Sequence, residues 1–441
     1  MPTPPLRALR RAAAVPVLVT LVAMSSMSLT GCTSDDVSPV PPDVSPGPSR
    51  MEPKPAGGPG DILVAGRAVT GSEPSGIPKF PFRRTYTDGE VYASVTGYRS
   101  LAFGDAGLER IVRSRLDAGK DVPTTIDPAL QRAAFDGLRG RTGAAIAVDV
   151  RSGEIMALVS TPAYDPGSFA GNTRADADAW GRLNSAEPRP TLNRALRRAE
   201  NPGSAAHLVV AATALEKGLV PSVDTATRTP LVHTVPGGTN RFTGPSPRCE
   251  NASLRTALKH SCTNVFAAIA ADLGAGPLKS TAAAFGFGDE TLDTPLRAAE
   301  SVWPDAPETP ARLALTANGL SDVTATPVQL ALVLATVLND GLRPGPRLLA
   351  SSDDPAPAPS VRVISARTAD QLADALGAAT TARVPSSSVN WALTTGRTPA
   401  GRTLAVAVTL SSAADTTADA TAIARRITAG QPAPAPAASR R

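Results

Sequence analysis

The chain contains 441 residues, of which 42% are hydrophobic, 19% charged and 4% aromatic, and its formal charge is +5. Two or three domains fit this length, and the hydrophobic fraction can fill a sizeable core. The composition therefore excludes a wholly disordered chain, a collagen and a small disulfide-rich scaffold. The positive charge is almost all arginine, and no lysine follows Lys279. Chemistry that needs a side-chain ammonium group is excluded beyond that position.

The N-terminus is typical of an export signal. Arg7, Arg10 and Arg11 form a basic stretch, and the apolar run 12–28 that follows is too short for a spanning helix. The run ends in Leu-Thr-Gly-Cys, which resembles the lipobox of bacterial lipoproteins and places the lipid on Cys32. We expect residues 1–31 to be a lipoprotein signal peptide and the mature protein to be anchored to the outer face of the cytoplasmic membrane. The alternative is an ordinary secretion signal followed by a chance cysteine.

Three stretches rich in proline and small residues are not expected to fold. Residues 32–60 are typical of an extended tether, residues 353–359 of an exposed loop and residues 431–441 of a disordered tail. Removal of the signal peptide lowers the formal charge to +2, because it contains three arginines and no acidic residue. No basic cluster with interleaved aromatic residues occurs in the sequence. We therefore expect the membrane as a partner, and no nucleic acid.

The remaining chain divides into a small region, 61–120, and a large one, 121–430. The small region resembles a pedestal: segments 62–64 and 91–95 are strand-like and 108–116 is helix-like. In the large region, Asp127 followed by Pro128 predicts the start of a helix that runs to Leu138. The apolar segments 144–150 and 155–160 predict a hairpin, 404–410 a further strand, and 208–217 and 416–427 helices. The large region is therefore expected to be a single α/β unit.

Two cysteines remain once Cys32 is assigned to the lipid. An exported location permits a disulfide between Cys249 and Cys262, and the alternative is two free buried thiols. His207, His233 and His260 show no metal-ligand spacing with these cysteines, so no metal and no cofactor are expected. We expect His233 and His260 to be surface or packing residues.

Several short motifs, taken together in their order, are informative. They are Thr96-Gly97-Tyr98, Gly107-Leu108-Glu109, 125–131, 153–160, 162–166, 192–195, 201–207 and 326–329. In order and spacing the chain resembles the class B penicillin-binding proteins of the short actinobacterial type. The resemblance implies an N-terminal pedestal and a mixed α/β transpeptidase domain, whose mainly antiparallel sheet is flanked by helices. It further implies an exported serine acyltransferase that cross-links peptidoglycan and is acylated by β-lactams.

The chemistry of that family depends on three motifs, S-x-x-K, S-x-N and K-T-G. The chain departs from all of them. Ser204 stands at the nucleophile position, but His207 replaces the first lysine; Ser261 is followed by Thr263 where the asparagine belongs, and Asn264 is displaced by one residue. One residue is about 100° of helical rotation, so Asn264 should point away from the site. In the third motif the resemblance assigns substrate binding to Thr394, Thr395 and Gly396, with Thr394 in place of the lysine and Arg397 on the wrong side of the turn.

Two functions follow from these departures. In the first, Ser204 caps its helix, His207 is a packed, hydrogen-bonded residue, and the protein is a catalytically impaired member of the family. It would then serve cell-wall assembly as a scaffold or as a binder of peptidoglycan stem peptides or of wall-synthesis proteins. In the second, Ser204 and His207 form a working dyad, because three-residue spacing places both on one helical face and a neutral imidazole can act as a base. The protein would then be an active serine D,D-transpeptidase or acyl hydrolase.

Overall fold

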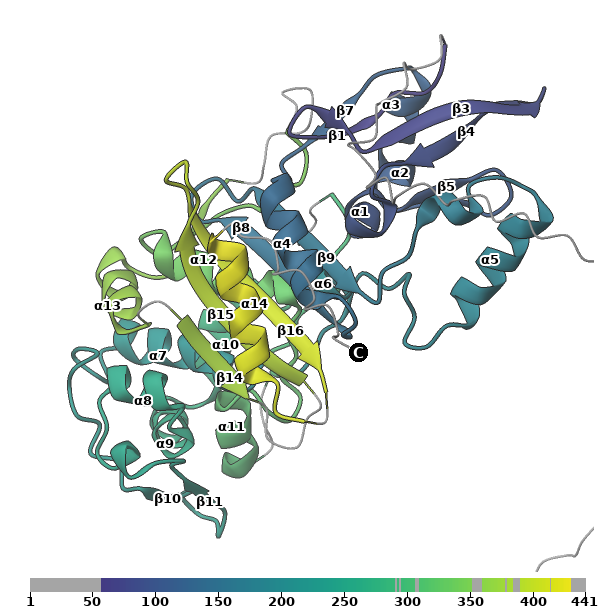
Figure 1. Ribbon diagram of the computed structural model, residues 1–441. Helices are drawn as coiled ribbons and strands as arrows, with labels where there is room; N and C mark the ends of the chain where they lie inside the picture. The colour runs from purple at the N-terminus through teal and green to yellow at the C-terminus, as the bar shows by residue number, and fades with distance from the viewer. Residues whose placement is uncertain are drawn as a thin grey trace, which may run out of the picture. The chain divides into compact units, whose positions relative to one another are not determined.

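The computed structural model describes residues 57–289, 292, 295–305, 309–350, 359–376, 389–412 and 414–429, and the backbone of residues 379–383 (Figure 1). The expected signal peptide, Cys32, the tether up to residue 56, the loop at 353–358 and the tail at 431–441 lie outside these residues. None of the helices found in the described residues combines the length and the apolar character that crossing a membrane requires.

A five-stranded antiparallel sheet forms the centre of the large domain. Its strand order is β14-β15-β16-β8-β9. The strands are β8 (Gly143–Asp149), β9 (Ile155–Thr161), β14 (Ala379–Arg383), β15 (Val389–Arg397) and β16 (Thr403–Ser411). The predicted hairpin and the predicted C-terminal strand are confirmed. Because two strands from the start of the domain pair with three from its end, the sheet closes the fold around the intervening helices.

Helices cover both faces of this sheet (Figure 1). One face packs against α4 (Pro128–Leu138) and α14 (Thr417–Ala429), and the other against α6 (Arg194–Arg197) and α12 (Pro327–Leu338). The side chain of Asp127 accepts hydrogen bonds from the N–H groups of Ala129 and Leu130, both at 2.9 Å, as the cap prediction requires. Every residue of β8 and β9 is buried, which is the pattern of a strand covered on both faces.

A helical lobe follows the sheet at the β14 edge and holds the first two motifs. It comprises a 3₁₀ turn η2 (Gly203–Ala206), α7 (His207–Glu216), α8 (Leu254–His260), α9 (Thr263–Leu273), α10 (Ala275–Ala284), α11 (Pro310–Ala317) and α13 (Ala366–Leu376). The remaining elements of this part of the chain are η1 (Pro166–Phe169), α5 (Arg174–Ser185), β10 (Val232–Thr234), β11 (Arg241–Thr243), η3 (Pro247–Cys249), β12 (Leu342–Arg343) and β13 (Val361–Arg362). The helix α7 is almost wholly buried, so it forms the core of the lobe.

The pedestal is a set of small sheets and helices. It contains β1 (Ile62–Val64), β2 (Arg67–Ala68), β3 (Thr70–Ile77), β4 (Phe80–Tyr86), α1 (Gly89–Thr96), β5 (Tyr98–Ser100), β6 (Gly104–Ala106), α2 (Leu108–Ile111), α3 (Arg113–Asp117) and β7 (Val122–Thr124). The strand expected at 91–95 is wrong: these residues lie in α1, which buries Val91, Tyr92 and Val95. A short apolar run cannot by itself distinguish a strand from a buried helix. The helix expected at 108–116 is broken at Val112 into α2 and α3.

Glu109, part of a motif singled out in the sequence, joins α2 to the strand β4 of the pedestal. Its carboxylate is fully buried and accepts a hydrogen bond from Arg84 Nε at 2.7 Å, while Arg84 Nη1 contacts Asp61 Oδ1 at 3.1 Å. Burial raises the pKa of Glu109, and the Arg84 charge opposes that rise. A buried charge that keeps its partner is structural in this position.

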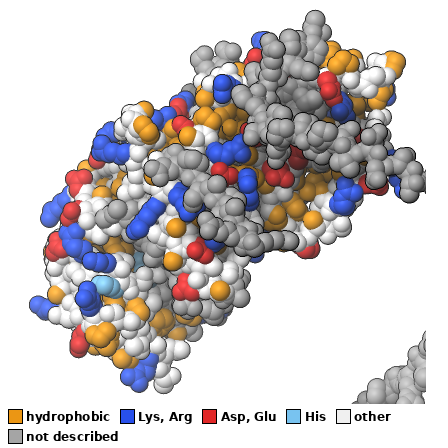
Figure 2. Space-filling model, viewed as in Figure 1, with side chains coloured by type: hydrophobic (Ala, Val, Ile, Leu, Met, Phe, Trp, Pro, Cys, Tyr) orange, Lys and Arg blue, Asp and Glu red, His pale blue; other side chains and the backbone are white. Residues whose placement is uncertain are grey.

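On the face of the molecule that Figure 2 shows, Lys and Arg side chains are interspersed with acidic and apolar ones.

Candidate active site

Ser204, the residue at the nucleophile position, lies in the tight turn that precedes α7. The turn is fixed by Gly203, which has φ 53° and whose N–H donates to the carbonyl of Gly319 at 3.0 Å. Ser204 is half-buried, and no hydrogen bond to its hydroxyl is found in the described residues. The expectation that it caps the helix is wrong, because Ala206 occupies the N-cap of α7 and no side chain caps it. The turn therefore leaves the Ser204 hydroxyl partly accessible, with no base bonded to it among the described residues.

His207, three residues further on, is buried inside the helical lobe. Its side chain is 1% exposed, and its ring stacks on that of Phe266 from α9 with the ring centroids 3.8 Å apart. Its Nε2 atom lies 2.9 Å from Oδ1 of Asn318, at the end of α11. Three helices therefore hold the imidazole, and it is packed as a core residue.

The hydrogen bonds of Asn318 decide which nitrogen of His207 carries the proton. Its Nδ2 group donates to the carbonyls of Ala314, at 2.8 Å, and Thr263, at 3.2 Å. Its Oδ1 atom therefore faces His207 as an acceptor, so Nε2 of His207 must be the donor. The free lone pair is then on Nδ1, which is buried without a partner in the described part of the chain.

The protonation chemistry of His207 follows from this packing. Burial lowers its pKa to about 4, although the hydrogen bond with Asn318 favours the charged form. A general base works best with a pKa near the working pH, so this imidazole is a poor proton acceptor for a hydroxyl. No hydrogen bond joins His207 to Ser204, although both residues are described. The Ser204–His207 dyad is not assembled in this structure.

The second motif lies where α8 meets α9. Ser261 ends α8 in the left-handed region, with φ 52°, and Thr263 opens α9, its hydroxyl donating to the carbonyl of Thr243 at 3.1 Å. Asn264 is fully buried, and its Nδ2 group donates to the carbonyls of Pro230 and Cys249 at 2.8 and 2.9 Å. Asn264 points into the lobe, as the rotation of one helical residue predicts, so no amide stands at the family's asparagine position.

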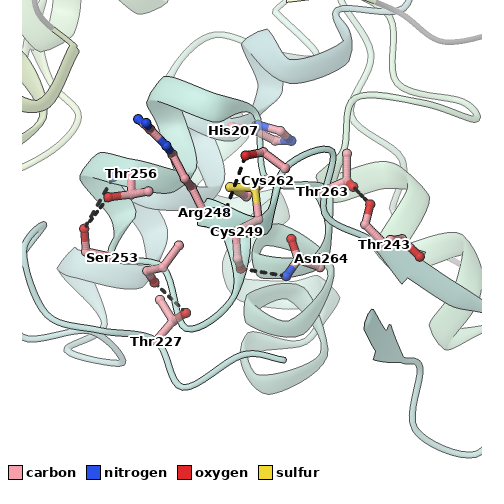
Figure 3. The surroundings of a disulfide bond; sticks show 12 residues. His207, Thr227, Thr243, Arg248, Cys249, Ser253, Thr256, Cys262, Thr263 and Asn264 are labelled. Atoms are coloured by element: carbon pink, nitrogen blue, oxygen red, sulfur yellow. Dashed lines mark hydrogen bonds between the residues drawn. A yellow bond between two sulfur atoms is a disulfide. The ribbon is translucent and has the colours of Figure 1, made fainter. Parts of the chain in front are cut away.

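A disulfide between Cys249 and Cys262 borders this motif (Figure 3). It joins the turn η3 to the residue that precedes α9, and the two Cα atoms are 5.3 Å apart. Both cysteines are fully buried. In Figure 3, His207 lies on one side of Cys262 and Asn264 turns toward Cys249 on the other. The bond closes a loop of 13 residues and fixes the position of Ser261 and Thr263 relative to that turn.

The residues assigned to the third motif do not lie on the strand that packs against the turn of Ser204. Thr394, Thr395 and Gly396 lie on β15, the second strand of the sheet, while the strand that packs against η2 is the edge strand β14. Thr394 is 3% exposed, and a side chain at Gly396 would collide with Thr428 of α14, at 2.2 Å from its Cβ. The burial of Thr394 and the close approach at Gly396 indicate packing roles for these two residues. The prediction followed a Thr-Gly pair and missed the topology that puts a different strand beside Ser204.

The strand β14 is the element of the sheet that packs against the turn of Ser204, and no sequence motif pointed to it. Its residues, 379–383, read Ala-Thr-Thr-Ala-Arg and contain no lysine. Neither β14 nor β15 can supply the family's third-motif lysine, because no lysine follows Lys279 in the sequence. Trp391 on the neighbouring strand links the sheet to the segment that precedes Ser204, because its Nε1 donates to the carbonyl of Asn201 at 2.9 Å. Asn318 carried no sequence signal.

The remaining expected residues are peripheral. His233 lies on β10 and His260 at the end of α8, both half-buried, and Arg397 is exposed at the end of β15. In the described parts of the chain no three His, Cys, Asp or Glu side chains gather so as to hold a metal ion.

Known protein families match most of this architecture. Residues 143–403 match the penicillin binding protein transpeptidase domain, and residues 59–133 match the penicillin binding protein A dimerisation domain. The peptidoglycan D,D-transpeptidase PbpA of Mycolicibacterium smegmatis is 31% identical over 353 residues, which cover 72% of this chain and 72% of that protein.

Solved structures agree with the sequence comparison. The crystal structure of PBPA from Mycobacterium tuberculosis has a TM-score of 0.75 at 28% identity and covers 85% of this chain and 99% of that one. The penicillin G acyl-enzyme complex of the same protein has a TM-score of 0.73 at 29% identity, with the same coverage. The sheet order, the helical lobe and the N-terminal pedestal together identify the fold, and the chain belongs to the class B penicillin-binding proteins of the actinobacterial type.

Proposed function

We propose that this protein takes part in peptidoglycan assembly as a catalytically impaired transpeptidase-fold protein, acting as a scaffold or as a binder of wall peptides. The observation that carries the proposal is the state of His207. At the position of the family's first lysine stands a buried imidazole, with its Nε2–H committed to Asn318 and its ring face to Phe266. Such a group cannot take the proton of the Ser204 hydroxyl without breaking its packing.

The other two motifs support the same proposal. The family holds the carboxylate of substrate or drug with a lysine on the strand beside the nucleophile. Here the strand β14 has no lysine, and the amide of Asn264 is committed to two carbonyls inside the lobe. A ligand carboxylate would therefore lack the charge-assisted hydrogen bond that the lysine gives it in the family. The site would also lack the amide that takes part in proton transfer there. The fold is kept and the groups that drive acylation are replaced.

The test is labelling of the full-length protein with a fluorescent penicillin, beside the Ser204→Ala variant. The relative PBPA of Mycobacterium tuberculosis, for which acyl-enzyme complexes exist, is the positive control. The proposal expects no label above that of the variant. Label on the wild type that disappears in Ser204→Ala would instead establish an active serine acyltransferase. Its base would then be a group other than His207 as it is packed here.

We further propose that the protein is a lipoprotein on the outer face of the cytoplasmic membrane, held through Cys32. The lipobox-like sequence before Cys32 supports this, because a lipid on that cysteine would hold the chain at the membrane surface. Fractionation of cells that produce the Cys32→Ala variant tests it. We expect the variant to leave the membrane fraction; unchanged membrane attachment would contradict the proposal.

A further inference from the structure

A cavity lies between the pedestal and the large domain, away from Ser204. It has a volume of about 540 Å³, which is in the range of small-molecule sites. The pedestal contributes α1, β5 and α2 to its lining, and the large domain contributes the end of β9, the segment 190–193 and α6. The rings of Tyr98 and Tyr164 also line it and meet edge to face, with their centroids 6.4 Å apart. The site therefore has an apolar body as well as polar edges.

The charged side chains that line this cavity are all arginines. Arg110 from α2, Arg197 from α6 and Arg297 line it, and none of the described lining residues is acidic. Arg197 Nη1 donates to the backbone carbonyl of Arg297 at 3.4 Å, so these two side chains come from adjoining positions. None of the three guanidinium groups forms an ion pair with a described residue. Arg110 lies near enough to Tyr98 to act on the pKa of its hydroxyl, opposing the rise that burial causes.

A fourth arginine adds positive charge behind the cavity wall. Arg194 is 2% exposed, and its Nη1 donates only to the carbonyl of Leu192, a lining residue, at 3.3 Å. Its Nε atom is buried without a partner in the described part of the chain, and no carboxylate pairs with it there. Burial lowers the pKa of Arg194, and the charges of Arg198 and Arg189 lower it further. Glu187 acts in the opposite sense, but no described carboxylate forms an ion pair with Arg194. A buried positive charge without such a partner is costly, and a bound anion would relieve it.

From the lining and its charges we infer that this cavity binds a small polyanion. Its phosphate or carboxylate groups would pair with the three guanidinium groups. An apolar or sugar-like part of the ligand would pack against the rings of the two tyrosines. Arginine suits both groups because its planar fork matches their oxygen geometry. Since the pedestal and the large domain each supply at least one arginine, the bound ligand joins the two. The inference does not depend on whether Ser204 is acylated.

Two probes test the inference and separate the sources of negative charge: inorganic diphosphate for phosphate and citrate for carboxylate. Each is titrated into the full-length protein by calorimetry at low ionic strength. The Arg110→Gln/Arg197→Gln/Arg297→Gln triple variant serves as the test, and Arg174→Gln, whose side chain is 92% exposed on α5, as the matched control. All of the substituted side chains are exposed, so the fold should survive, which circular dichroism verifies.

We expect at least one probe to bind the wild type and the control alike, and the triple variant to lose about tenfold or more in affinity. A preference for diphosphate would assign the phosphate class, and a preference for citrate the carboxylate class. The inference is overturned if neither probe binds the wild type at about 10 mM, or if the triple variant binds as tightly as the control.

Discussion

The buried imidazole of His207 makes the stability of the protein depend on pH in a calculable way. Its pKa is about 4 in the native state, against an ordinary value of 6.5. Between these two values the unfolded chain binds a proton that the native chain does not. This part of the stability is therefore fully present above the unfolded pKa and is lost as the pH falls through 6.5 toward 4. At about 1.4 kcal/mol per pKa unit, the loss reaches roughly 2 kcal/mol near pH 5 and roughly 3 kcal/mol near pH 4.

The measurement compares the wild type with His207→Gln, whose amide can still donate to Asn318 but does not titrate. Urea unfolding is followed by circular dichroism at several pH values, and the difference in unfolding free energy is taken, because the contributions of other groups cancel in it. His260→Gln, at a half-buried position outside the core, is the matched control for the replacement of a histidine by glutamine. A wild-type-minus-variant difference that stays constant to about 0.5 kcal/mol from neutral pH to pH 4.5 would refute the account of His207.

Three further substitutions test the contacts that hold the site. Phe266→Ala should cost about 3–5 kcal/mol in urea unfolding, because the side chain is fully buried, and should raise the pKa of His207 in an NMR titration by admitting water; an unmoved pKa would contradict the packing argument. Gly319→Ala should lower the melting temperature, since Gly319 has φ 65° and an added Cβ would lie 2.1 Å from the carbonyl oxygen of Gly203; a variant as stable as the wild type would show that this close approach is absent. Asp127→Ala should cost about 1 kcal/mol through the loss of the α4 cap, measured by the same unfolding experiment, while Asp127→Asn should retain most of the stability.

Local signals in the sequence predicted most of the fold. The cap at Asp127, the hairpin of β8 and β9, and the strand β16 all have strong local patterns, and the structure confirms them. The helix α1 could not be distinguished from a strand, because its short apolar run is buried by contacts with α4 and β9 that are distant in the sequence. Tertiary packing therefore decides that this segment is a helix and not a strand.

The candidate site was predictable only in its first two motifs. Ser204, His207, Ser261 and Thr263 follow from their position in a family pattern, and the structure brings their elements together around α7 and α9. The third motif could not be located, because it depends on which strand pairs at the edge of the sheet. Asn318, which sets the tautomer of His207, comes from a helix end more than a hundred residues away, and no local pattern announces it.

The claim at the centre of this account is that Ser204 has lost its base. The most direct measurement is intact-mass spectrometry of the full-length protein after prolonged incubation with a penicillin, with Ser204→Ala alongside. The account predicts an unchanged mass for both proteins, because His207 is packed against Phe266 and its Nε2–H is committed to Asn318. A stoichiometric gain of one penicillin mass in the wild type alone would contradict it.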